Sequence, residues 1–290
     1  MYIRIMEALA TPKKTLELLK KYRIKSKKAL GQNFLIDQNI LNKIVEAANL
    51  TPRDVVLEIG AGIGTLTQAL ASRAKTVLAV EFDRVLLTLL KETLREQRNV
   101  IMVARDALKL DLKDLPKDTP RPNKMVANLP YNIATTIILN YLERFPELKS
   151  YVVMLQKEVG KRVIANPGGK EYGAVSIKIR FYCHAEIISS VSRKVFIPQP
   201  KVDSVIVKLQ RHTVPPVAVT DPSFLFKTIA AAFSHRRKTL KNALITYRLG
   251  APEKIDTALK MSRINPIRRA ETLSLEEFAI LSHNLQESGV

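Results

Sequence analysis

Three glycines at alternate positions, Gly60, Gly62 and Gly64, are the first residues whose spacing could serve a chemical purpose. The chain holds only ten glycines, so three within five residues require a cause. Glycine permits a sharp turn and lets a ligand approach the backbone closely. The turn follows Val-Val-Leu-Glu-Ile at 55–59, which predicts a buried strand, and precedes a helical pattern from Thr65. This succession indicates a nucleotide-type binding unit, although a tight turn without a ligand would also fit.

Two acidic residues each follow an apolar stretch that, like 55–59, predicts a buried strand. Glu81 ends the stretch 76–80, where a carboxylate can accept hydrogen bonds from both hydroxyls of a ribose. Asp106 lies just past the stretch 100–104, where it could accept from an adenine amino group or simply cap a turn. The glycine spacing departs from Gly-x-Gly-x-x-Gly, which argues against a dinucleotide. Glu-x-Gly-x-Gly-x-Gly at 58–64 instead resembles motif I of S-adenosylmethionine (SAM) methyltransferases.

The segment Asn128-Leu129-Pro130-Tyr131 follows a further apolar stretch. Proline directly after a buried strand ends the strand and stiffens the turn. The turn then exposes an amide, backbone carbonyls and an aromatic ring. Together these could hold a planar amine, because the oxygens accept from the amino group and the ring stacks on the base. A Pro-Tyr turn packed in the core is the alternative. Phe196, in a proline-rich loop, is either a core residue or a second stacking surface.

These residues require a framework that brings the ends of several strands together. Apolar stretches alternate with amphipathic ones, and such βαβα alternation implies a doubly wound, mostly parallel α/β sheet with helices on both faces. Ligands of these sheets bind beyond the carboxyl ends of the strands. The predicted strands are 55–59, 76–81, 100–104, 124–128, 151–156, 185–191 and 203–209, and the predicted helices between them are 65–73, 83–97, 133–143 and 156–165.

Past Val214-Pro215-Pro216-Val217 the pattern changes to helices alone, near 222–235, 237–249, 253–260 and 274–286. We therefore expect three parts. They are a basic N-terminal extension at 1–30, which includes a helix from Thr11 to Tyr22, a SAM-dependent methyltransferase domain at 31–212, and a small helical RNA-binding domain at 213–290.

The formal net charge is +20, from 47 Lys and Arg against 27 Asp and Glu. This excess predicts binding to a polyanion, of which nucleic acid is the commonest. Two basic clusters are candidates for contact with an RNA backbone, although either could be a solvated charged face. They are Lys25, Lys27 and Lys28 in the N-terminal extension, and Arg236, Arg237 and Lys238 in a turn between two predicted helices.

Several classes of site are excluded. The single cysteine, Cys183, rules out an internal disulfide and a thiolate metal cluster, and the four histidines lie too far apart to predict a metal site. The first 25 residues lack the apolar core of a signal peptide, and no run of about 18 apolar residues predicts a membrane span. We expect a monomer in a reducing, cytoplasmic compartment, without metal or membrane.

Taken together, the motifs resemble those of the ribosomal RNA adenine dimethyltransferases, from about Ser26 to the C-terminus. The forms Leu129-Pro130-Tyr131 and Arg236-Arg237-Lys238-Thr239-Leu240 favour the bacterial small-subunit branch. The motifs in question are Gly31-Gln32-Asn33-Phe34-Leu35, the glycine motif at 58–64, Glu81, Asp106, Asn128-Leu129-Pro130-Tyr131, and Phe196-x-Pro198-x-Pro200-x-Val202-x-Ser204.

The resemblance implies an enzyme that uses SAM to dimethylate the exocyclic amino groups of two adjacent adenosines. In this family the adenosines lie in the 3′-terminal hairpin loop of small-subunit (16S) ribosomal RNA, and the substrate is a partly assembled small subunit. Tyr131 and Phe196 would sandwich the target adenine. The residues implied to bind SAM are Asn33, Leu35, Gly60, Gly62, Glu81, Asp106 and Asn128, and those implied to act at the base are Asn128, Leu129, Pro130, Tyr131 and Phe196.

Three other interpretations remain open at this point. The related enzymes that methylate large-subunit ribosomal RNA share the cofactor motifs. A non-catalytic nucleic-acid-binding factor could keep the fold, although the intact glycines and the intact 128–131 segment argue against a loss of catalysis. A nicotinamide dehydrogenase is disfavoured by the glycine spacing and by the net charge.

Overall fold

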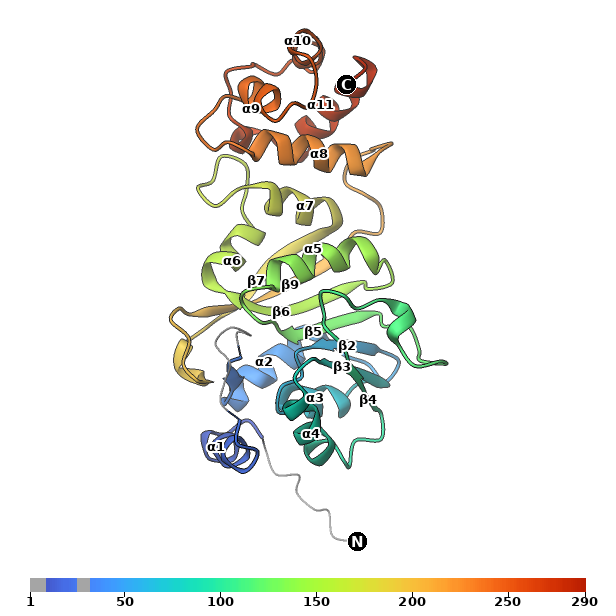
Figure 1. The fold of residues 1–290 in the computed structure, drawn as a ribbon, viewed down its shortest axis with the longest axis vertical. Coiled ribbons are helices and arrows are strands. Elements are labelled where there is room, and N and C mark those ends of the chain that lie inside the picture. Colours follow the sequence, from blue (N-terminus) through green and yellow to red (C-terminus); the bar gives the residue numbers. More distant parts are fainter. Residues whose placement is uncertain (1–8, 25–31) are drawn as a thin grey trace. The chain divides into compact units, whose positions relative to one another are not determined.

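The computed structural model describes residues 9–24 and 32–290, and the chain forms a seven-stranded sheet (Figure 1). Four of the strand pairs, β2–β3, β3–β4, β2–β5 and β5–β6, are parallel, whereas β6 and β9 are antiparallel. The doubly wound sheet predicted from the sequence is therefore present. In spatial order its strands are β4 (Val100–Ala104), β3 (Thr76–Glu81), β2 (Val55–Ile59), β5 (Lys124–Asn128), β6 (Ser150–Gln156), β9 (Ser204–Arg211) and β7 (Cys183–Val191).

The order of the strands creates a crevice. From β2 the chain moves outward to β3 and β4, then returns to β5 on the other side of β2 and continues to β6. The direction of winding thus reverses between β2 and β5. Ligands of open α/β sheets bind beyond the carboxyl ends of the strands at such a reversal.

Helices cover both faces of this sheet. On β6, Val152 and Met154 belong to an apolar cluster with residues of α2 and α3. Tyr151, next to Val152 in the strand, donates its hydroxyl to the carbonyl of Tyr141 in α5. Successive side chains of a strand point to opposite faces, so α5 packs on the other side. The helices here are α2 (Gln38–Ala48), α3 (Thr65–Ala71), α4 (Arg84–Thr93), α5 (Ala134–Arg144) and α6 (Lys157–Val163).

Local sequence explains where several helices begin. The side chains of Thr11, Asp37 and Asp83 accept hydrogen bonds from backbone N–H groups in the first turns of α1 (Pro12–Lys21), α2 and α4. Such caps satisfy N–H groups that have no partner within the helix. Thr11 followed by Pro12 had predicted the start of α1 from the sequence, and this is confirmed.

A two-stranded ladder lies outside the sheet and was not predicted. β1 (Phe34–Leu35) pairs antiparallel with β8 (Phe196–Ile197), with Leu35 opposite Phe196. It brings the segment before α2 against the proline-rich loop before β9. The structure also contains short 3₁₀ turns at Leu112–Asp114, Arg193–Val195 and Ala270–Thr272.

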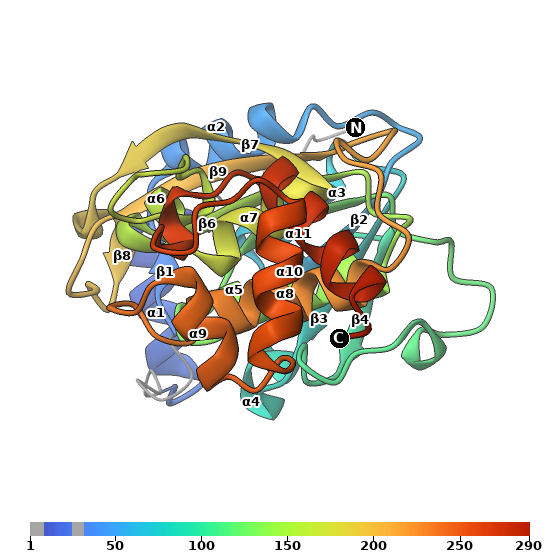
Figure 2. The ribbon, with the colours of Figure 1, turned by 90° about the horizontal axis from the view of Figure 1, so that it is seen from above.

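The chain packs into two compact units. The first unit consists of Met1–Gly160 and Glu186–Arg211, and the second unit consists of Lys161–Ala185 and His212–Val290. The second unit is mainly helical, as predicted, with α8 in contact with α9 and α11 (Figure 2). Residues 161–185 join this unit because Ile177 and Phe181 of α7 are buried in its core. The division at 212/213 into separate domains stays a prediction. The helices are α7 (Ala174–Tyr182), α8 (Pro222–Phe233), α9 (Leu240–Thr246), α10 (Pro252–Met261) and α11 (Leu275–Glu287).

Candidate active site

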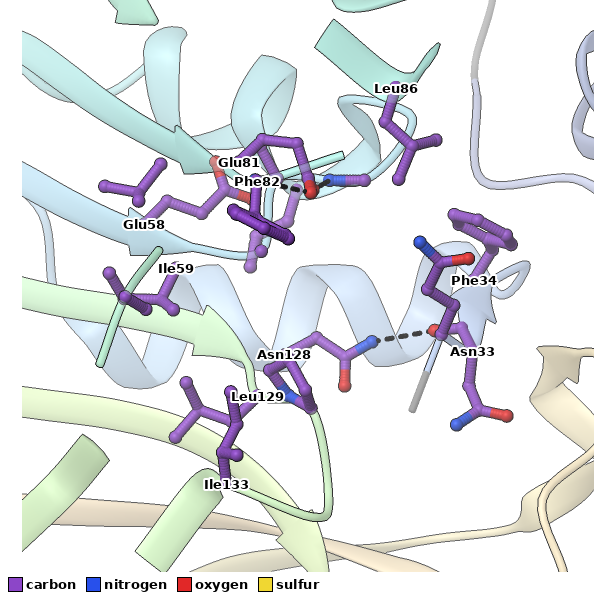
Figure 3. A pocket seen from close by; sticks show the side chains of 18 of the residues that line it. Asn33, Phe34, Glu58, Ile59, Glu81, Phe82, Leu86, Asn128, Leu129 and Ile133 are labelled. Atoms are coloured by element: carbon purple, nitrogen blue, oxygen red, sulfur yellow. Dashed lines mark hydrogen bonds between the residues drawn. The ribbon is translucent and has the colours of Figure 1, made fainter. Parts of the chain in front are cut away.

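A pocket of about 290 Å³ opens in the first unit beyond the carboxyl ends of β2, β3 and β5 (Figure 3). It lies at the crevice that the strand order predicts. Of the residues proposed from the sequence for the cofactor and the target base, all but Phe196 line it. These are Asn33, Leu35, Gly60, Gly62, Glu81, Asp106, Asn128, Leu129, Pro130 and Tyr131.

The glycine loop forms one wall of the pocket. Gly60, Gly62 and Gly64 have φ values of +74°, +61° and +89°, a region that residues with a side chain rarely adopt. A Cβ atom at Gly62 would lie 3.5 Å from the ring of Phe34, another pocket residue. The positive φ values therefore account for glycine at these positions, whereas a Cβ at Gly62 would make only an ordinary van der Waals contact with Phe34.

The Glu81 side chain connects the glycine loop to the end of β3 by hydrogen bonds. One carboxylate oxygen accepts from the Gly62 N–H at 2.9 Å, and the other accepts from Phe82 N–H at 2.8 Å and Asp83 N–H at 2.9 Å. Burial raises the pKa of Glu81, and these backbone hydrogen bonds oppose the rise. The carboxylate is held in a fixed orientation at the pocket wall, as a group that binds two ribose hydroxyls must be.

Glu58 is a second acid at this wall, and the sequence analysis gave it no role. It is 1% exposed, and its Oε2 atom has no hydrogen-bond partner among the described residues. Burial raises the pKa of Glu58 to about 8, and the neighbouring charge of Glu81 adds to the effect, whereas the Thr67 hydroxyl opposes it. Glu58 is therefore mostly protonated at neutral pH.

Asp106 lies at the pocket wall beyond β4 and also caps a turn. Its Oδ1 atom accepts from the backbone N–H of Leu108 at 2.9 Å. The two roles considered from the sequence are thus compatible, because the turn fixes the side chain next to the pocket.

Asn128, at the end of β5, is oriented by the opposite wall. Its Nδ2 donates to the backbone carbonyl of Asn33 at 3.1 Å. In Figure 3 the oxygen end of the amide points away from Asn33. Because the carbonyl can only accept, the nitrogen must face it, and Oδ1 is left to accept from a ligand.

Phe196 does not reach the pocket. Its ring is 2% exposed and packs in the apolar cluster that contains Leu35 and Ile206. The cause is the β1–β8 ladder, which places Phe196 opposite Leu35 in the core. A ring without an exposed face cannot stack on a base. The structure therefore does not form the predicted sandwich of Tyr131 and Phe196 around an adenine. The sandwich stays a prediction, and it requires the Phe196 ring to become exposed.

The sequence analysis missed Phe82, which lines the pocket with 62% of its surface exposed. An exposed aromatic side chain at the wall of a pocket suits a planar ligand group. The available signal was its position, because it directly follows the acid that ends β3.

Of the two basic clusters predicted from the sequence, the structure describes only one. Arg236, Arg237 and Lys238 lie exposed in the turn between α8 and α9, as predicted, and Lys238 donates to the Thr246 hydroxyl. Lys25, Lys27 and Lys28 lie outside the described residues. Within residues 9–24 and 32–290, no three acidic, histidine or cysteine side chains gather as a metal site, and no helix is long and apolar enough to cross a membrane.

Comparison with known proteins decides the family. Residues 23–287 match the family described as ribosomal RNA adenine dimethylase. The chain belongs to this family. It is 46% identical over 280 residues to ribosomal RNA small subunit methyltransferase A of Alkaliphilus metalliredigens (strain QYMF), which covers 96% of this chain and 98% of the relative. The protein of the same name from Bacillus mycoides (strain KBAB4) is 46% identical over 286 residues, 97% of this chain and 98% of the relative.

Solved structures similar to this ribosomal RNA adenine dimethylase agree with its fold. A dimethyladenosine transferase from Plasmodium falciparum has a TM-score of 0.72 at 28% identity and covers 89% of this chain and 98% of its own. The 23S rRNA methyltransferase ErmE has a TM-score of 0.65 at 27% identity and covers 88% and 100%. The fold is Rossmann-like, and the protein is a SAM-dependent methyltransferase.

The pocket fits SAM by the groups that it presents. The wall contains a fixed carboxylate, an exposed aromatic ring, a second carboxylate and a glycine turn, and these groups are compatible with the ribose, the adenine and the amino-acid end of SAM. No pyrophosphate-binding spacing is needed, because SAM carries no phosphate.

Proposed function

We propose that the protein dimethylates the exocyclic amino groups of two adjacent adenosines in the 3′-terminal hairpin loop of small-subunit ribosomal RNA. The observation that carries the proposal is the orientation of Asn128, whose Nδ2 is held by Asn33 while Oδ1 remains available as an acceptor. The full-length similarity to two proteins named ribosomal RNA small subunit methyltransferase A supports the choice of substrate.

SAM, when bound, supplies an electrophilic methyl group on a sulfonium centre. The exocyclic nitrogen of adenine is a poor nucleophile, because its lone pair is delocalised into the ring. Asn128 Oδ1 accepts from one N–H of this group, and a backbone carbonyl of Leu129 or Pro130 accepts from the other. These hydrogen bonds favour a tetrahedral nitrogen, whose lone pair then points toward the methyl group. Orientation of this kind can contribute roughly 7–11 kcal/mol to catalysis.

No general base is needed in this scheme. The nitrogen becomes strongly acidic once it is alkylated, so its proton passes to solvent after the transfer. Neither of the buried acids, Glu58 and Glu81, is asked to take it. Glu58 is mostly protonated, and both oxygens of Glu81 accept from backbone N–H groups.

The cofactor contacts follow from the pocket wall. Glu81 binds the ribose hydroxyls, Asp106 and Phe82 hold the adenine, and the backbone at Gly60 and Gly62 borders the amino-acid end. Asn33 and Leu35 close the pocket from the side of β1.

The RNA contacts lie beyond this pocket. The target adenine stacks on Tyr131, which offsets the cost of removing a base from its stack; each stacked base contributes about 1–3 kcal/mol. Arg236, Arg237 and Lys238 contact RNA phosphates, together with Lys25, Lys27 and Lys28. We further propose that the protein acts as a monomer on small ribosomal subunits in the cytoplasm.

The test is to incubate the protein with SAM and unmethylated small subunits, and to identify the modified nucleoside by digestion and chromatography. Dimethyladenosine is the expected product. A methyl group on any other base or on the ribose would overturn the proposed chemistry. Calorimetry with SAM, and with NAD as the control, would test the cofactor independently of the RNA.

A further inference from the structure

The hydroxyl of Tyr131 makes a contact that base stacking does not require. It lies 2.6 Å from the hydroxyl of Ser204, at hydrogen-bonding distance. Tyr131 is half-buried and lines the pocket, whereas Ser204 is fully buried. A phenylalanine would stack on a base as well as a tyrosine does, because stacking uses the ring face. The hydroxyl therefore serves another purpose.

Ser204 is a firm point of attachment. It is the first residue of β9 and lies opposite Gln156 at the end of β6 in the antiparallel ladder. The preceding residue, Asp203, accepts from the backbone N–H of Arg193 at 3.0 Å through its side chain, and from that of Lys157 at 3.0 Å through its carbonyl. Ser204 is thus preceded by a residue that two hydrogen bonds fix, and it is itself paired in the ladder with Gln156.

Tight packing fixes the same point from the helix side. Gly160 of α6 lies so close to β9 that a Cβ atom there would be 2.2 Å from Cγ2 of Val205. Side chains cannot approach so closely, so the start of β9 has little freedom to move.

The bond joins two segments that are remote in the sequence. Tyr131 belongs to the turn after β5, which carries Asn128, and Ser204 ends the proline-rich loop that begins at Phe196. Between the two segments lies the end of β6, since the sheet order is β5, β6, β9. The bond therefore spans one strand and connects both loops that the sequence motifs assign to the target base.

We propose that Ser204 is a positioning residue for methyl transfer, which holds the Tyr131 ring at the angle needed to stack on the target adenine. The inference rests on the proposed function, and it adds a residue to which that function gives no role. Burial raises the pKa of Tyr131, and the hydrogen bond to Ser204 opposes the rise. The phenol stays protonated at neutral pH, so the contact persists under assay conditions.

The test is a double-mutant cycle with Tyr131→Phe, Ser204→Ala and the double variant. Each removes one or both hydroxyls and keeps the ring. We expect each single variant to lower kcat on unmethylated small subunits by roughly three- to tenfold, the size expected for one hydrogen bond. The double variant should be no slower than either single variant, because the three variants all remove the same single bond. SAM affinity should be unchanged in all three.

Ser150→Ala is the matched control. Ser150 is also a buried serine of the sheet. It is the first residue of β6, whereas Gln156 is the last, so Ser150 lies at the end of the strand that is away from the pocket. It should leave kcat unchanged. If Ser204→Ala does not fold, Ser204→Cys fills a similar space with a weaker hydrogen-bonding group and tests the same point. Full activity of the folded Ser204 variant, or losses that multiply in the double variant, would overturn the proposal.

A second readout separates this inference from the proposed function. The chain has eight tyrosines, so ring resonances of a protein labelled with ¹³C-tyrosine can be assigned to Tyr131 by their loss in Tyr131→Phe. Ser204→Ala should shift or broaden that one signal in the RNA-free protein, and an unchanged signal would exclude the bond. A wild-type protein that transfers no methyl group to small subunits would instead overturn the proposed function and, with it, the positioning role.

Discussion

At the scale of single residues, one end of the Asn128 amide is held by the protein and the other faces the proposed ligand. Nδ2 donates to Asn33, so the acceptor atom keeps a fixed direction without help from a ligand. Glu81 is fixed in the same way by three backbone N–H groups. The two side chains lie in one pocket but serve different partners in the proposed reaction, the target amine and the cofactor ribose.

This difference can be measured. Asn128→Ala should lower kcat by about 100-fold or more, because it removes an interaction that orients the nucleophile, and should change SAM affinity much less. Glu81→Ala should weaken SAM binding first, because it removes the ribose acceptor and a support of the glycine loop. Calorimetry with SAM and single-turnover methyl transfer would be compared for both variants. Unimpaired transfer by Asn128→Ala would exclude its role in positioning the amine.

Glu58 predicts a dependence of stability on pH. An unfolded chain loses the Glu58 proton near pH 4.5, whereas the folded protein keeps it until about pH 8. The folded state holds an additional proton between these values, so this group's contribution to the free energy of unfolding falls as pH rises through the window. Glu58→Gln is neutral at every pH and lacks the effect.

Wild type should therefore lose stability relative to Glu58→Gln between about pH 4.5 and about pH 8. Urea unfolding of both proteins at several pH values in this window would measure the difference. Carboxylates that do not interact with Glu58 titrate alike in the two proteins and cancel. A difference in unfolding free energy that stays constant with pH would show that Glu58 is not held protonated.

At the scale of elements, the sequence predicted the strands of the sheet to within a few residues. β2 (Val55–Ile59) and β3 (Thr76–Glu81) match their apolar runs, because strands buried on both faces carry a continuous hydrophobic signal. The two residues of β1 and of β8 gave no such signal, since pairing between Phe34–Leu35 and Phe196–Ile197 depends on segments that are far apart in the sequence.

The same limit applies to the site. The cofactor residues could be placed because each follows a strand, and carboxyl ends of parallel strands meet at one edge. The burial of Phe196 could not be foreseen, because it depends on the β1–β8 ladder. α7 (Ala174–Tyr182) was also missed. It follows a clear glycine turn, but its apolar face is short and becomes recognisable only against the helical core of the second unit.

The N-terminal helix α1 supports the pocket through an apolar cluster. Leu18, 2% exposed, belongs to one cluster with Phe34, Ile63 and Leu86, which line the pocket. Leu18→Ala should therefore destabilise the protein by about 2–4 kcal/mol and weaken SAM binding.

Leu16 of the same helix is 54% exposed and provides the control. Leu16→Ala should change stability by less than about 0.5 kcal/mol and leave SAM affinity unchanged. Urea unfolding and calorimetry would test both variants. Equal effects of the two substitutions would show that α1 does not support the pocket wall.

At the scale of the whole molecule, the net charge of +20 dominates the encounter with RNA. Cations that neutralise RNA phosphates release counterions, so binding to RNA should weaken steeply with salt. The paired substitution Arg236→Ala/Arg237→Ala should lower RNA affinity and flatten the dependence of log affinity on log salt. The slope should change by about one unit or somewhat less for each phosphate that the variant no longer neutralises.

Lys227→Ala/Lys260→Ala is the control for that variant, because it removes the same charge from exposed positions in the same unit. Filter binding to small-subunit ribosomal RNA at several salt concentrations would compare the two. A similar flattening in both would mean that charge alone, and not the turn between α8 and α9, accounts for the attraction.

The most direct test of the central claim is the transfer of labelled methyl groups from SAM to unmethylated small subunits and, separately, to large-subunit ribosomal RNA. The account predicts dimethyladenosine on the small subunit and no label on the large-subunit RNA. Label on large-subunit RNA, or no label on either substrate by a protein that binds SAM, would contradict it.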